Sequence, residues 1–205
     1  MKLLQNHKYS KVNAKKQLAA YAALVSQKTT FSEQKDVLPF FKQSPDLNLL
    51  ICYHLPKMRT ADCFATEFDI YGDFKADLIV GDRAKNSYLL VEFEDGTPDS
   101  IFKKKAGKST PDWSRRFEGA HSQLMDWLWK LDDMRQTNDF RNTFGNSSAK
   151  FSGIIITGKN MTLDNQELER LEWRTSKTSV AHSDILCVSF DELLENFQHY
   201  ISIYK

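Results

Sequence analysis

The spacing of hydrophobic and polar positions changes once along the chain, near residue 60. Before that point, apolar residues recur at helical spacing over residues 10–28, which predicts a first helix. A second helix is predicted from Ser32 to Phe41. A third opens at Ser44, where a capping residue precedes a proline, and runs toward His54. The first fifty or so residues are therefore expected to be helical.

From Cys63 onward the apolar residues alternate with polar ones in the manner of β-strands. Three strands are predicted, each separated from the next by a short turn: Cys63–Ile70, Phe74–Val80 and Tyr88–Glu94. Adjacent strands joined by such short turns form an antiparallel meander.

The remaining sequence alternates between helical and strand patterns. A polar, basic loop is expected to reach Pro111, followed by a long amphipathic helix, then strand, helix, strand and helix; the expected segments are 112–131, 151–157, 164–175, 185–190 and 191–200. A meander followed by α/β units predicts an α/β fold with a mixed central sheet flanked by helices. We expect residues 1–43 to form a helical N-terminal extension and residues 44–205 the main domain.

Charge and cysteine content narrow the function classes. The formal net charge is +1, so any phosphate binding requires a local basic patch. One candidate patch consists of Lys103, Lys104, Lys105, Lys108, Arg115 and Arg116, although a solvated basic loop explains the same residues. The 3 cysteines have no zinc-ligand spacing. No apolar stretch has the length of a signal peptide or a membrane span, so a cytoplasmic protein without membrane contact is expected.

Two carboxylates lie within predicted strands among apolar neighbours, Asp77 in one and Glu92 in the next. A carboxylate in such a position is costly unless it is paired or binds a cation. Glu94 is expected on the same face as Glu92, since strand side chains alternate. A divalent cation such as Mg²⁺, which prefers oxygen ligands, would relieve the repulsion among the three. Pairing of Asp77 with Lys75 is the simpler alternative.

This arrangement resembles a known family. The matching pieces are the segments FKADLIV, YLLVEFED, AHSQLMDW, GIIITGK and VSFDELL, in that order. Together they are similar to the PD-(D/E)xK nuclease superfamily, and more specifically to the Shedu-type nuclease domain of bacterial anti-phage defence proteins. The resemblance implies a restriction-endonuclease-like core in residues 44–205.

The resemblance also implies roles for individual residues. It implies that the chain is a DNA endonuclease dependent on Mg²⁺ or Mn²⁺. The implied metal ligands are Asp77, Glu92 and the backbone carbonyl of Phe93. Glu67 would be an auxiliary acid and Gln123 would position substrate or water. His121 would lie beside Gln123, although an interior histidine is the alternative. The basic patch would contact DNA phosphates, and a homo-oligomer is implied.

One position departs from the family pattern. Glu94 stands where the motif has a lysine, which would stabilise charge near the scissile phosphate. Either Glu94 acts as a ligand or water-orienting base, or the lysine has moved, with Lys103, Lys104 and Lys105 as candidates. The second function class follows from the same departure: a nuclease-fold module without catalysis that binds nucleic acid or a protein partner.

Overall fold

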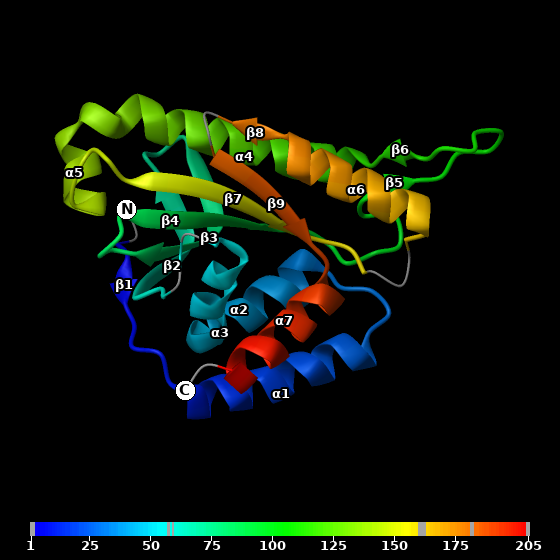
Figure 1. Ribbon diagram of the computed structural model, residues 1–205, viewed down its shortest axis with the longest axis horizontal. Helices are drawn as coiled ribbons and strands as arrows, with labels where there is room; N and C mark the ends of the chain where they lie inside the picture. The colour runs from blue at the N-terminus through cyan, green and yellow to red at the C-terminus, as the bar shows by residue number, and fades with distance from the viewer. Residues whose placement is uncertain (1–2, 57, 59, 160–162, 181–182, 204–205) are drawn as a thin grey trace.

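A seven-stranded mixed sheet forms the centre of the computed structural model, which describes all residues except 1–2, 57, 59, 160–162, 181–182 and 204–205 (Figure 1). The strands of this sheet are β1 (Gln5–Asn6), β2 (Cys63–Ile70), β3 (Phe74–Asp82), β4 (Ser87–Phe93), β7 (Lys150–Ile156), β8 (Ser179–Val180) and β9 (Ser183–Val188). Their order across the sheet is β1-β2-β3-β4-β7-β9-β8. The expected α/β fold with a mixed sheet flanked by helices is therefore confirmed.

The pairing of the strands has two parts. β2, β3 and β4 form the predicted antiparallel meander, whereas β7 and β9 run parallel to β4. The short strands β1 and β8 at the two edges were not predicted, because two residues are too few to show an alternating pattern. The carboxyl ends of β4, β7 and β9 consequently lie along one end of the sheet.

Helices cover both faces of this sheet (Figure 1). One face packs against the helices of the N-terminal third and the last helix, and we call it the N-terminal helix face; these are α1 (Lys11–Gln27), the π-helical turn η1 (Glu33–Val37), α2 (Leu38–Lys42), α3 (Pro45–Leu50), the 3₁₀ turn η2 (Ile51–His54) and α7 (Phe190–Ile203). The other we call the α4 face; it carries α4 (Arg115–Asp133), the 3₁₀ turn η3 (Met134–Gln136), α5 (Asn138–Phe144) and α6 (Asn165–Lys177).

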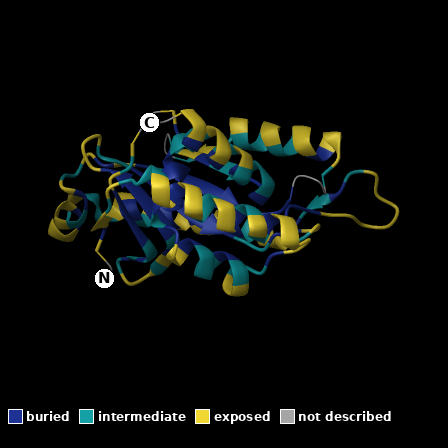
Figure 2. Cartoon of the chain, turned by 90° about the horizontal axis from the view of Figure 1, so that it is seen from below, coloured by how far each residue is buried: buried dark blue, intermediate teal, exposed yellow. Residues whose placement is uncertain are grey.

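Hydrophobic burial holds these layers together. Figure 2 shows the strands as a buried layer between helices whose outer surfaces are exposed. On β3, Leu78 and Val80 join the core under the N-terminal helix face, whereas Ile79 joins the core under α4. Ala76, however, also joins the α4 core, although regular alternation would place it with Leu78. The alternation of β3 is therefore interrupted between Ala76 and Leu78, at Asp77.

The segment between β4 and α4 differs from the predicted loop. It contains a small hairpin, β5 (Phe102–Lys103) paired with β6 (Asp112–Trp113), which extends from the body of the protein (Figure 1). The helix that was expected near Asp112 begins at Arg115, because the Ser114 hydroxyl caps it by accepting a hydrogen bond from the Phe117 amide at 3.0 Å. We call residues 102–113 the hairpin arm.

No helix in the described part of the chain combines the length and the apolar character that crossing a bilayer requires. The cytoplasmic location expected from the sequence stays a prediction. The boundary predicted at residue 43 also stays a prediction, although α2 packs into the same core as the sheet through the buried Phe41.

Candidate metal and nuclease site

Asp77 and Glu92 lie opposite each other on adjacent strands. The last paired residues of β3 and β4 are Leu78 and Val91, and one further step of this antiparallel register pairs Asp77 with Glu92. The two carboxyl groups share a hydrogen bond. Asp77 Oδ2 also accepts a hydrogen bond from the backbone amide of Phe93 at 2.9 Å. The sequence-predicted pair is thus brought together at the carboxyl end of β4.

Two more acids complete a group that we call the carboxylate cluster: Glu33, Asp77, Glu92 and Glu94. Burial is the main cause that raises the pKa of Asp77 and of Glu92, and Glu92 is only 6% exposed. Repulsion from Asp77 and Glu94 raises the pKa of Glu92 further. Burial, followed by repulsion from Glu33, raises the pKa of Glu94 to about 7. The cluster therefore holds more negative charge than its surroundings stabilise.

Glu33 is the member that sequence reasoning missed. Its backbone amide donates a hydrogen bond of 2.7 Å to Asp95 Oδ1, just beyond β4. Phe31 forms two backbone hydrogen bonds of 3.1 Å with Gly96, and a Cβ at Gly96 would lie 2.5 Å from the Phe31 ring. The glycine therefore permits the close approach that carries Glu33 to the end of the sheet. In the sequence, an acid after Ser32 resembles an ordinary first-turn residue of a helix.

Glu67 lies beside the cluster on the neighbouring strand. The register of β2 and β3 places it opposite Asp77, between the pairs Thr66–Leu78 and Phe68–Ala76. Its φ of 50° is unusual for a residue other than glycine and interrupts the alternation of β2 as Asp77 does on β3. Its carboxylate forms ion pairs with Lys42 at 3.1 Å and Lys75 at 3.6 Å. The ion pair of Lys75 is therefore with Glu67. Lys75 also lowers the pKa of Asp77, but this effect is the smallest of the causes that act on Asp77.

The two predicted residues of α4 occupy different surroundings. His121 is buried next to Glu118 and Arg174, and burial is the main cause that lowers its pKa. Its charged neighbours are residues of α4 and α6, which matches the interior-histidine alternative. Gln123 is exposed. It lies seven residues from both Arg116, which pairs with Glu94, and Lys130, which pairs with Asp73 at the β2–β3 turn.

Residues spaced by seven share one face of a helix with a drift of about 20°. The face of α4 that carries Gln123 therefore borders the sheet between the carboxylate cluster and the β2–β3 turn. This argument places Gln123 on the same face of α4 as Arg116, two helical turns further along, and the catalytic roles predicted for Gln123 and His121 stay predictions.

The basic residues of the hairpin arm are divided among several acidic partners. Lys105 and Lys108 both pair with Asp112, and Lys104 pairs with Asp164 and Glu167 at 3.9 and 3.7 Å. A cleft of about 480 Å³ lies between the arm and the start of α4; its lining residues are Asp99, Lys103, Lys105, Asp112, Trp113, Ser114, Arg115 and Arg116. Four of the six predicted basic residues therefore share one concave surface.

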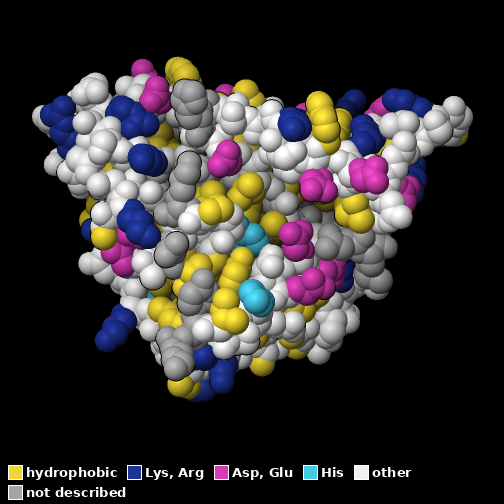
Figure 3. Space-filling view, in the orientation of Figure 1, with side chains coloured by type: hydrophobic (Ala, Val, Ile, Leu, Met, Phe, Trp, Pro, Cys, Tyr) yellow, Lys and Arg dark blue, Asp and Glu magenta, His cyan; other side chains and the backbone are white. Residues whose placement is uncertain are grey.

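On the face seen in Figure 3, basic and acidic side chains are interspersed, in keeping with the formal net charge of +1. The concave cleft beside the arm is thus a better candidate for binding phosphate than the surface seen in this view.

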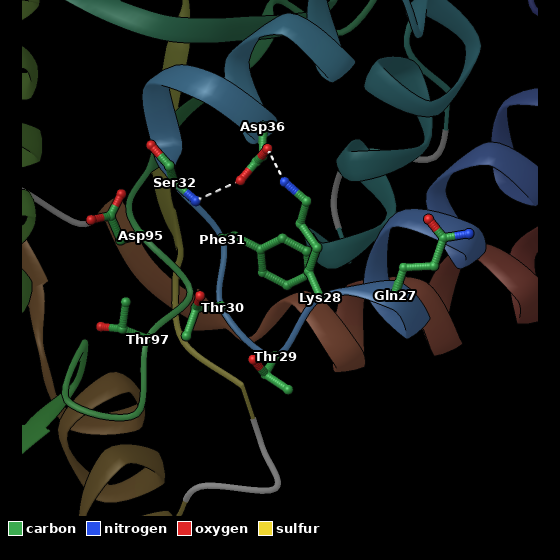
Figure 4. Close-up of a pocket in the computed structure, with 9 residues that line it drawn as sticks. All are labelled: Gln27, Lys28, Thr29, Thr30, Phe31, Ser32, Asp36, Asp95 and Thr97. Atoms are coloured by element: carbon green, nitrogen blue, oxygen red, sulfur yellow. Dashed lines mark hydrogen bonds and ion pairs between the residues drawn. The ribbon is translucent and has the colours of Figure 1, made fainter.

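A second concave surface has Asp95 among its lining residues. This pocket of about 540 Å³ is bordered by the 27–32 segment, Asp36, Asp95 and Thr97, with the Phe31 ring between its walls (Figure 4). Lys28 is held there by Asp36, whose other oxygen accepts the Ser32 amide at 2.9 Å. Asp95 borders this pocket and pairs with Arg116, which lines the basic cleft.

The donors of the cluster fit a metal ion held by few protein ligands. Among the described residues, no three side chains of His, Cys, Asp or Glu are arranged as a ligand set. Asp77 and Glu92 nevertheless face each other through a shared hydrogen bond, and the backbone carbonyl of Phe93 belongs to the same strand end. Mg²⁺ typically uses one or two carboxylates and fills its other positions with water or phosphate. Two carboxylates and one carbonyl satisfy that requirement.

The fold and the site define a class: an α/β protein with buried, facing carboxylates at the carboxyl end of a mixed sheet. The family comparison is more specific. Residues 31–194 match the family model described as Shedu protein SduA, C-terminal, and the chain belongs to this family. The match includes Glu33 and all the predicted site residues. A comparison with curated proteins gave no match.

The charge of the cluster predicts how stability depends on pH. The pKa of Glu92 is raised, so its protonated form stabilises the fold fully below the ordinary value of 4.5, and this contribution is lost as pH rises toward the folded value. Without metal, Glu92→Gln should therefore be more stable than wild type at pH 8, by at least about 1 kcal/mol, with the difference closing toward pH 4.5. Urea unfolding of both proteins across this range measures the difference; a constant difference would contradict the assignment.

Proposed function

We propose that this protein is a metal-dependent DNA endonuclease that hydrolyses phosphodiester bonds in bacterial anti-phage defence. The observation that carries the proposal is the buried pair Asp77 and Glu92, hydrogen-bonded to each other with two further acids around them. Without a cation, the ionised forms of these acids would cost stability, so the cluster would have to bind protons instead. Membership of the Shedu family supports both the nuclease activity and the defence role.

The proposed core is of the PD-(D/E)xK type. The antiparallel meander β2–β3–β4, the long helix α4 and the parallel strand β7 follow one another in the order that the resemblance implies. The motif acids are then Asp77 on β3 and Glu92 on β4. Glu33 reaches the same point from the N-terminal helix face, and we include it as a fourth acid of the proposed active site.

Each residue has a distinct task in the proposed reaction. Asp77, Glu92 and the Phe93 carbonyl would hold Mg²⁺ or Mn²⁺, which when bound lowers the pKa of a coordinated water and stabilises developing negative charge. Glu94 would accept the proton of the attacking water, because its carboxylate belongs to the same cluster as the two metal-binding acids and pairs with Arg116 at its outer side. Glu67 and Gln123 would orient groups beside the site.

DNA would be held by its phosphates. Lys103, Lys105 and Arg115 line the cleft between the hairpin arm and α4 together with Arg116, whose guanidinium pairs with Glu94 of the carboxylate cluster. Phosphate contacts of this kind would position a substrate without reading its sequence. The ion pairs of Lys105 and Lys108 with Asp112 are exposed, so phosphate can compete for these lysines at small cost. Assembly into a homo-oligomer, implied by the resemblance, is part of the same proposal.

The proposal is tested by incubating the protein with supercoiled and linear DNA in Mg²⁺, in Mn²⁺ and in EDTA. We expect nicking or linearisation in the presence of metal and none in EDTA. A protein that binds DNA with the same affinity in EDTA and in Mn²⁺, has no measurable Mn²⁺ affinity and cuts neither substrate would instead be the non-catalytic binding module, which the missing motif lysine favours.

A further inference from the structure

Arg116 is the cation in the described structure whose ion pairs reach the motif position occupied by Glu94. It lies in the first turn of α4, with Nε 3.8 Å from Glu94 Oε2 and Nη1 bound to Asp95 Oδ2. Its charge also lowers the pKa of Glu33, across the cluster. The side chain remains 41% exposed, so part of the guanidinium faces solvent. Arg116 also lines the basic cleft, and it therefore belongs to both the acidic and the basic parts of the site.

The other candidate cations have different partners. Lys104 pairs with acids at the start of α6, and Lys105 pairs with Asp112 on the hairpin arm. Lys75 pairs with Glu67 at 3.6 Å and is 62% exposed. None of these ion pairs involves Glu94, so two of the three lysines that the sequence offered as replacements, Lys104 and Lys105, are directed toward other acids.

We propose that the Arg116 guanidinium contacts the scissile phosphate and supplies the positive charge that the motif lysine supplies in the family. This inference rests on the proposed nuclease function. Its geometric basis is the position of the guanidinium between Glu94 and the basic cleft. A planar guanidinium can donate to two phosphate oxygens at once, so it suits this contact better than a point charge. Asp95 holds the group in place through one nitrogen and leaves other donors for substrate.

The proposal divides between two residues the tasks that one lysine is expected to combine. Arginine keeps its charge at all relevant pH values, so Arg116 stabilises charge without transferring protons. Proton transfer from water then falls to Glu94. Glutamate at the motif position is consequently compatible with catalysis, because the positive charge arrives from α4 instead of from β4.

The test compares four single variants on supercoiled DNA in Mn²⁺: Arg116→Gln, Arg116→Lys, Asp95→Asn and Lys75→Gln. Arg116→Gln should lower kcat by about 10²–10³-fold, the usual loss when one donor to a developing charge is removed. Arg116→Lys should be at least about tenfold more active than Arg116→Gln, because it restores the positive charge, although not the paired donors of the guanidinium. Lys75→Gln should stay within about threefold of wild type, since an exposed ion pair contributes little.

Asp95→Asn separates a phosphate contact from a structural ion pair. The amide keeps an oxygen for the Glu33 backbone but loses the ion pair with Arg116. If Arg116 served only to hold Asp95, Asp95→Asn and Arg116→Gln would lose the same activity. We expect Arg116→Gln to lose at least about tenfold more cutting activity than Asp95→Asn loses. The Mn²⁺ affinity of Arg116→Gln, measured by calorimetry, should equal or exceed that of wild type, because this variant lacks a positive charge beside the metal.

Each outcome decides a different claim. Cutting by wild type together with undiminished kcat in Arg116→Gln would overturn the role of Arg116 and leave the nuclease standing. Equal losses in Asp95→Asn and Arg116→Gln, or a large loss of Mn²⁺ affinity in Arg116→Gln, would also overturn it. Failure of wild type to cut in either metal would overturn the nuclease and this inference with it.

Discussion

Replacement of Glu92 by glutamine is expected to reduce metal-dependent DNA cutting by about 10³-fold or more, because one of two carboxylate ligands is lost. Glutamine has the same size and can keep a hydrogen bond with Asp77, so the fold should remain intact. The variant lacks the negative charge that would hold Mg²⁺ or Mn²⁺. Single-turnover cutting of supercoiled DNA measures the rate, and calorimetry with Mn²⁺ measures the loss of metal binding directly.

The matched control is Glu172→Gln, which makes the same chemical change at an exposed position of α6. It should cut at the wild-type rate. A Glu92→Gln protein that cuts as fast as this control would remove Glu92 from the active site. Loss of cutting with unchanged Mn²⁺ affinity would place Glu92 in the reaction but not among the metal ligands.

The carboxylate pair was predictable from sequence because strands constrain their neighbours. Asp77 and Glu92 each interrupt an apolar run, and a short hairpin between two strands fixes which residues face each other. The same logic predicted the order and type of the central strands and most helices. A sustained apolar or alternating pattern over six or more residues is a strong signal, and the central strands and the long helices have it.

Glu33 was not predictable because its position depends on a long-range contact. The chain reaches the cluster through the backbone pairing of Phe31 with Gly96, sixty-five residues apart. No local pattern encodes such a pairing, and an acid in the first turn of a helix has an ordinary explanation. The role proposed for Arg116 was not predictable for a similar reason. In the sequence Arg116 is one of six basic residues of the predicted patch. Its ion pairs with Glu94 and Asp95 depend on where α4 begins, at Arg115.

The hairpin arm was not predictable from the sequence for a different reason. Its two strands contain two residues each, too few for an alternating pattern. Stacking stabilises it instead: the Phe102 and Trp113 rings lie 4.4 Å apart, and the Arg170 guanidinium lies 4.9 Å from the Phe102 ring. The arginine comes from α6, so the anchor of the arm lies far along the chain.

The lysine of the GIIITGK segment anchors the N-terminal helix and, through it, the part of the chain that carries Glu33. Lys159 is 5% exposed, and its Nζ donates hydrogen bonds to the carbonyls of Val25 at 3.2 Å and Lys28 at 3.0 Å. These carbonyls end α1, where no further helical turn can satisfy them. The ammonium also lies 3.7 Å from Asp191 and 5.0 Å from the centre of the Phe31 ring.

Lys159→Met should therefore destabilise the protein by about 2–4 kcal/mol, since it leaves one buried carbonyl, one partly buried carbonyl and a carboxylate without this donor. Urea unfolding measures the loss, and Lys150→Met is the control: Lys150 begins β7 and is exposed, so its replacement should change stability by less than about 0.5 kcal/mol. Equal stability of the two variants would show that Lys159 is not an anchor. If Lys159→Met also cuts DNA more slowly at a temperature where it is folded, the anchoring of the 25–33 segment contributes to the placement of Glu33 as well as to stability.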